Sequence, residues 1–190
     1  MILGLDTGTA TCGWALLDDA RCEFVDLGVV VQPKRDEART ATLERERRAH
    51  NQARVITSKA PGCSTVVVEQ LSLGIRGKIA CLSVGLSWGI ILGSVAQLEA
   101  LGHPRPRLLT IAPQRWQREV LPSAEGEVDY EELARRAAAH LLRRHPRASA
   151  ALERIPAKHR NHAIDAAMIA LVGALRPHRC DAVGETKEAA

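Results

Sequence analysis

The chain has 190 residues, of which 46% are hydrophobic and 25% charged, the balance of a globular protein that buries one core. The formal net charge is +4, and 21 of the 26 basic residues are Arg. Arg presents a planar fork of donors, so this charge fits a phosphate-rich partner, although a solvated surface explains it equally well.

The five cysteines exclude both a disulfide framework and a zinc cluster, because their number is odd and no CxxC pair occurs. Four of them stand among apolar or small residues, as buried thiols do. Met1 leads directly into the first apolar run, without a signal or transit peptide. We therefore expect a cytoplasmic protein.

The first third of the chain predicts three strands, a helix and a fourth strand. Short turns separate the strands, and the helix is polar with spaced apolar positions that end at Pro61-Gly62. The predicted strands are 2–6, 12–18, 22–32 and 64–69, and the helix is 36–59.

An uncharged run from Ile79 to Leu98 is long enough for a membrane span, but its Ser and Gln residues dilute the apolarity. We predict a mostly buried helix over 78–101 and no membrane association. Gly85, Gly89 and Gly93 form a ridge that allows close backbone approach. We favour a homodimer contact there; packing against the chain's own sheet is the alternative.

The remaining chain predicts one more strand and three helices. The predicted elements are a strand at 108–111, a short helix at 112–121, a linker at 123–126, a basic helix at 130–145, an irregular segment at 149–160 and a helix at 162–175. We expect a single domain over 1–178 and a disordered tail over 179–190.

Four side chains predict a metal site. Asp6 ends the first strand, Glu69 ends the fourth, and His162 and Asp165 share one face of the last helix because they are three residues apart. A carboxylate at the end of a buried strand is costly to desolvate unless it is paired or binds a metal. A structural role as a helix cap or in a salt bridge is the alternative for each of them.

Three motifs, in this order, resemble RuvC-type Holliday-junction resolvases. They are Leu3-Gly4-Leu5-Asp6-Thr7-Gly8-Thr9, Val67-Val68-Glu69-Gln70 and Asn161-His162-Ala163-Ile164-Asp165-Ala166-Ala167. The segment Ile111-Ala112-Pro113-Gln114-Arg115-Trp116 further resembles the phage and organellar branch of that family. The resemblance implies an α/β, ribonuclease H-like fold: a five-stranded mixed sheet flanked by helices.

The same resemblance implies that 1–178 is a nuclease domain of an endonuclease that resolves four-way DNA junctions as a homodimer. Such a protein would be nucleoid-associated, with an organellar or phage origin left open. Two Mg²⁺ ions, for which Mn²⁺ can substitute, would be bridged by Asp6, with Glu69 on one and Asp165 on the other. His162 has two open roles, as a metal ligand or as a proton carrier for the attacking water.

Phosphate contacts are expected from basic residues beside the site. The candidates are Arg76, Lys78, Arg115, Arg118, Lys158 and Arg160.

Two other functional classes are alternatives to a junction resolvase. One is a ribonuclease H-like nuclease that cleaves other branched DNA or precursor ribosomal RNA. The other is a non-catalytic nucleic-acid or actin-like nucleotide binder, and an actin-like enzyme needs a much longer chain.

Overall fold

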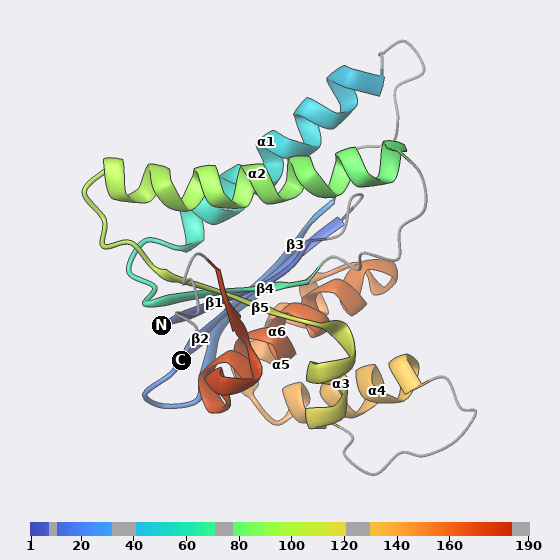
Figure 1. Cartoon of the computed structure of the whole chain (residues 1–190). Coiled ribbons are helices and arrows are strands. Elements are labelled where there is room, and N and C mark those ends of the chain that lie inside the picture. Colours follow the sequence, from blue (N-terminus) through green and yellow to red (C-terminus); the bar gives the residue numbers. More distant parts are fainter. Residues whose placement is uncertain (8–10, 32–40, 71–77, 121–129, 184–190) are drawn as a thin grey trace, which may run out of the picture.

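A six-stranded mixed sheet forms the centre of the computed structural model, which describes residues 1–7, 11–31, 41–70, 78–120 and 130–183 (Figure 1). Its strand order is β3-β2-β1-β4-β5-β6. The strands are β1 (Ile2–Asp6), β2 (Thr11–Asp18), β3 (Glu23–Val31), β4 (Thr65–Glu69), β5 (Arg107–Ile111) and β6 (Asp181–Ala182). β1, β4 and β5 run parallel, and the other pairs are antiparallel.

Helices cover both faces of this sheet, α1 and α2 on one face and α3 to α6 on the other (Figure 1). They are α1 (Ala41–Lys59), α2 (Lys78–Ala100), α3 (Pro113–Val120), α4 (Tyr130–Arg143), α5 (Pro146–Arg154) and α6 (Arg160–Leu175). Two short 3-10 turns, η1 (Ala157–His159) and η2 (Pro177–Arg179), flank α6. None of the helices in the described ranges has the length and apolarity needed to cross a membrane.

The pleat of β1 divides its side chains between two hydrophobic cores. Leu3 and Leu5 pack toward α1 and α2, whereas Ile2 packs in the core around α6. Successive residues of a strand point to opposite faces, so Gly4 and Asp6 face α6. This face is where the catalytic candidates meet.

Two glycines allow α6 to lie directly on the sheet. A Cβ at Gly4 would collide with the backbone of Ala166 and Ala170, and a Cβ at Gly13 would collide with the backbone carbonyl of His162. Backbone atoms cannot swing aside as a flexible side chain can. The helix α6 can therefore lie this close to β1 and β2 only because Gly4 and Gly13 have no side chain.

The segment 149–160 was wrongly predicted to be irregular. Pro146 opens α5 at its first turn, and Ala148, Ala151 and Leu152 are buried at helical spacing. The small alanine side chains let this helix pack against β3. Because alanine is only weakly hydrophobic, the amphipathic pattern is not evident in the sequence.

The sheet also has one strand more than the five predicted. Asp181 and Ala182 pair with Thr110 and Leu109 of β5, although the sequence places them in a tail. A strand of two residues is too short to show the alternation of apolar and polar side chains, and the pairing depends on the turn η2 before it.

Four predictions lie outside the described residues: the tail over 184–190, the loop after Gln70, the linker 123–126 and the start of the first helix.

Replacement of Gly13 by Ala should destabilise the protein by about 1–3 kcal/mol, because the new methyl group forces α6 away from β2. Urea unfolding followed by circular dichroism measures the change. Ala20→Ser adds one atom in an exposed turn and serves as the control. Equal midpoints for Gly13→Ala and wild type would contradict the close packing.

Candidate active site

Asp6 and Glu69 lie together because their strands are parallel neighbours. Leu5 of β1 pairs with Val68 of β4, so each carboxylate comes next, at the same edge of the sheet. Asp6 is 6% exposed, and Glu69 is half-buried. The pleat turns both side chains toward α6.

His162, in the first turn of α6, contacts Asp6 directly. Its Nδ1 lies 2.6 Å from Oδ2 of Asp6, a distance typical of a charge-assisted hydrogen bond. This bond raises the pKa of His162 above its usual value against the opposing effect of partial burial. The imidazole is therefore held in a fixed orientation, with its protonated form favoured.

Glu69 is held from another direction by Trp116 of α3. The Trp116 indole is fully buried, and its Nε1 donates a hydrogen bond of 2.9 Å to Oε1 of Glu69. Burial, and then the negative charge of Asp6, raise the pKa of Glu69 to about 8, although the Trp116 hydrogen bond acts in the opposite direction. Asp165 adds to the rise. The three acidic residues thus form one electrostatic cluster.

Asp165 is covered by Arg135 of α4. The Arg135 Nη2 is 2.7 Å from Oδ2, and its Nε is 3.1 Å from both carboxylate oxygens. Asp165 is only 3% exposed, so this guanidinium supplies a countercharge that water does not.

The donor set fits a hard divalent cation. Carboxylate oxygens are the ligands that such cations prefer. Burial is the largest cause of the raised pKa of Glu69, and the negative charges of Asp6 and Asp165, which a cation would offset, add to it. The Thr7 hydroxyl, next to Asp6, is buried without a hydrogen-bond partner in the described chain. As placed, however, no three acidic, His or Cys side chains among the described residues converge on one metal position. Asp6, Glu69 and Asp165 are each turned toward a partner within the protein.

The six predicted DNA-binding residues have different settings. Arg118 and Lys158 are exposed. Arg115 donates to the Arg179 carbonyl and the Asp181 carboxylate, and Arg160 donates to the Ile155 carbonyl. Arg76 and the side chain of Lys78 lie outside the described part of the structure.

Two residues at the site are not among the predicted site residues. Trp116 belongs to a segment that resembles the phage and organellar branch, and Arg135 belongs to the predicted basic helix 130–145. Ala134, Ala138 and Leu142 are fully buried and mark the inner face of α4. Arg135 follows Ala134 directly, so it lies beside this buried face. The i, i+4, i+8 spacing of the three apolar residues is the sequence feature that could have indicated its position.

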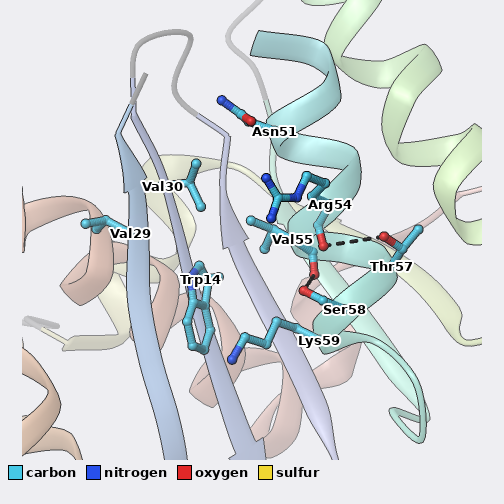
Figure 2. Close-up of a pocket in the computed structure, with 9 residues that line it drawn as sticks. All are labelled: Trp14, Val29, Val30, Asn51, Arg54, Val55, Thr57, Ser58 and Lys59. Atoms are coloured by element: carbon cyan, nitrogen blue, oxygen red, sulfur yellow. Dashed lines mark hydrogen bonds between the residues drawn. The ribbon is translucent and has the colours of Figure 1, made fainter. Parts of the chain in front are cut away.

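A separate hollow of about 610 Å³ lies on the opposite face of the sheet, between α1 and strands β2 and β3 (Figure 2). Its floor is apolar, with Trp14 as the largest side chain. The Lys59 ammonium lies 4.0 Å from the centre of the Trp14 ring and 3.4 Å from the Asp26 carboxylate. The catalytic candidates lie on the other side of the sheet from this hollow.

Comparison with solved structures identifies the fold. RuvC of Thermus thermophilus in complex with a Holliday junction substrate matches with a TM-score of 0.61 at 17% identity, covering 96% of this chain and 98% of that chain. A further Thermus thermophilus RuvC structure has a TM-score of 0.58 at 17% identity, covering 96% of this chain and 99% of that one. The yeast mitochondrial Holliday junction resolvase has a TM-score of 0.60 at 14% identity, and the match covers 94% of this chain and 81% of that chain.

These likenesses confirm the predicted ribonuclease H-like class: the chain has the fold of RuvC-type resolvases over nearly its whole length. No protein-family model and no curated protein sequence matches it. The likeness is therefore one of structure, at low sequence identity.

Replacement of Glu69 by Gln should stabilise the metal-free protein at alkaline pH. The folded-state pKa of about 8 lies above the ordinary 4.5, so the folded protein binds this proton more tightly, and stability falls as pH rises from 4.5 to 8. Gln mimics the protonated acid and can still accept the Trp116 hydrogen bond.

We expect Glu69→Gln to raise Tm at pH 8 by at least about 2–4 °C, which corresponds to about 1 kcal/mol in a domain of this size. The gain should vanish near pH 4.5. Thermal unfolding in EDTA across this range provides the measurement, with Glu23→Gln at an exposed position of β3 as control. A gain independent of pH would count against the raised pKa.

Proposed function

We propose that this protein is a metal-dependent endonuclease that resolves four-way DNA junctions. The observation that carries the proposal is the meeting of Asp6, Glu69, His162 and Asp165 at one edge of the sheet, in a fold shared with RuvC. That neighbour was solved with a Holliday junction substrate. A non-catalytic protein of this fold would not need all four of these side chains.

Asp6, Glu69 and Asp165 would hold Mg²⁺, with two ions per site and Mn²⁺ able to substitute. Bound there, divalent cations would neutralise the scissile phosphate and lower the pKa of the attacking water. The oxygen-rich donor set and the crowding of negative charge around Glu69 support this assignment.

His162 is suited to proton transfer. Asp6 fixes the ring through Nδ1, so Nε2 is left at the other side of the imidazole, available to a water molecule or a DNA oxygen. The raised pKa of His162 favours its protonated form, which can donate a proton to the leaving 3′-oxygen or stabilise negative charge on the phosphate. In the neutral form, with the Nδ1 proton on the Asp6 side, Nε2 can accept the proton of the attacking water.

DNA would approach the edge of the sheet where these residues lie. Among the candidates in the described ranges, Arg115, Arg118 and Lys158 are exposed. Arg115 and Arg160 have partners within the protein, so they are better placed to support the surface than to lead in binding phosphate. Arg76 and Lys78 complete the proposed set. Contacts of this kind make binding fall with salt.

A second copy of the chain is the proposed partner of α2. The helix carries no charged residue between Gly85 and Leu98, and Leu86 and Leu92 are 42% and 44% exposed. A Cβ at Gly85, Gly89 or Gly93 would meet nothing within 4 Å. Two cuts at symmetric positions need two sites related by a two-fold axis, and a ridge of small residues suits an isologous contact.

The cytosol, beside the nucleoid, is the compartment that we propose. Cys12, Cys22, Cys63 and Cys180 are free thiols, as a reducing compartment favours.

Asp6→Asn should abolish cleavage of a synthetic four-way junction, with a loss of at least about 10³-fold, while junction binding persists. The substitution removes the charge that faces both His162 and the proposed cations. Gel assays with Mg²⁺ measure cleavage, and mobility shifts in Ca²⁺ measure binding. Undiminished cleavage would contradict the assignment. Faster cleavage of structured RNA or of other branched DNA would move the proposal to a different ribonuclease H-like nuclease.

Gly89→Glu should convert the dimer to a monomer without unfolding it. The exposed position has room for the side chain, and Glu favours a helix over Gly by about 0.5–1 kcal/mol. Light scattering after size exclusion measures the mass. Gln114→Glu introduces the same charge at an exposed position of α3, on the other face of the sheet. A monomeric wild-type protein, or an unchanged dimer, would refute this interface.

A further inference from the structure

Arg135 covers Asp165 in a geometry that leaves neither carboxylate oxygen free of it. Nη2 contacts Oδ2 at 2.7 Å, and Nε lies 3.1 Å from each oxygen. Such a fork is the strongest hydrogen-bonded pairing that a carboxylate makes with a side chain. A cation could bind the Asp165 carboxylate only if Arg135 first moved away from it.

The influence of Arg135 extends beyond this pair. Its positive charge opposes the rise in the pKa of His162, so it is close enough to act on both α6 residues of the site. Its side chain is 24% exposed, whereas that of Asp165 is 4% exposed. The guanidinium therefore has an edge toward solvent, and Asp165 has almost none.

The neighbouring Arg136 shows that this arrangement is particular to one position of α4. Arg136 is 72% exposed, and its Nε lies 3.0 Å from Glu132 one turn earlier on the same helix. It is an ordinary surface ion pair, and such pairs contribute little.

We propose that Arg135 is an internal counterion that competes with the divalent cation for Asp165 and, once released, binds a phosphate of the DNA. This inference rests on the proposed nuclease function, which supplies the cation and the phosphate. A guanidinium binds phosphate in the same two-pronged manner as carboxylate, so the exchange replaces one strong pairing with another.

The exchange gives the protein two properties. Without DNA, Arg135 weakens cation binding, because the cation must displace a fixed positive charge from a buried carboxylate. With DNA present, the released guanidinium gains the phosphate, so DNA and cation reinforce each other's binding. Arg135 thus acts on cation binding through Asp165, as a positioning residue.

The test measures Mn²⁺ binding to the full chain without DNA, by titration calorimetry, in wild type, Arg135→Gln and Arg136→Gln. We expect Arg135→Gln to bind Mn²⁺ about tenfold more tightly, because the competing charge is gone. Arg136→Gln should bind as wild type does. Unchanged or weaker binding by Arg135→Gln would overturn the proposal and leave a purely structural ion pair.

Two further variants keep the result interpretable. Arg135→Lys retains a charge without the fork and should give an intermediate affinity, which decides the matter if Arg135→Gln does not fold. In an Asp165→Asn background, Arg135→Gln should no longer tighten Mn²⁺ binding. The same gain in that background would show that Arg135 does not act through Asp165.

DNA affinity supplies the second arm. At saturating Ca²⁺, which releases Arg135 from Asp165, a fluorescent four-way junction should bind Arg135→Gln more weakly than wild type or Arg136→Gln, by about fivefold. Equal affinity in all three would overturn the phosphate role. Neither arm measures cleavage, so a failure here is distinct from a failure of Asp6→Asn to abolish activity.

Discussion

The close contact between α6 and the sheet is the constraint on which the rest of the site depends. Gly4 and Gly13 carry no Cβ where the α6 backbone passes, so the helix lies on β1 and β2 without side chains between them. This contact places His162 2.6 Å from Asp6 and presents the carboxylate of Asp165 to the same edge. A helix packed at an ordinary distance over side chains would hold the same residues too far away.

Negative charge gathered at one edge has a cost, and the protein offsets it locally. His162 faces Asp6, Trp116 faces Glu69 and Arg135 faces Asp165, each from an element distant in sequence. Burial, and then the negative charges of Asp6 and Asp165, still raise the pKa of Glu69 to about 8. A cation bound there would offset part of this repulsion.

Much of the fold could be predicted from local sequence because its elements carry strong patterns. β1 and β4 are short apolar runs ending in a carboxylate, and α2 begins and ends close to its predicted limits. The failures fall where the local signal is weak: α5 is a helix of small alanines after Pro146, and β6 is two residues long. In both places packing against an edge of the sheet provides what the segment itself lacks, α5 on β3 and β6 on β5.

The sequence alone determined which residues are candidates for chemistry, since a carboxylate at a strand end and an i, i+3 pair on a helix are local features. It also indicated the ribonuclease H-like class through the order of its elements. Only the tertiary structure decided what faces each carboxylate. The roles of Trp116 and Arg135 depend on α3 and α4 packing beside α6, and no pattern within either helix specifies the acidic residue that each one reaches. Contacts between distant segments arise from the packing of whole elements, which short-range periodicity does not encode.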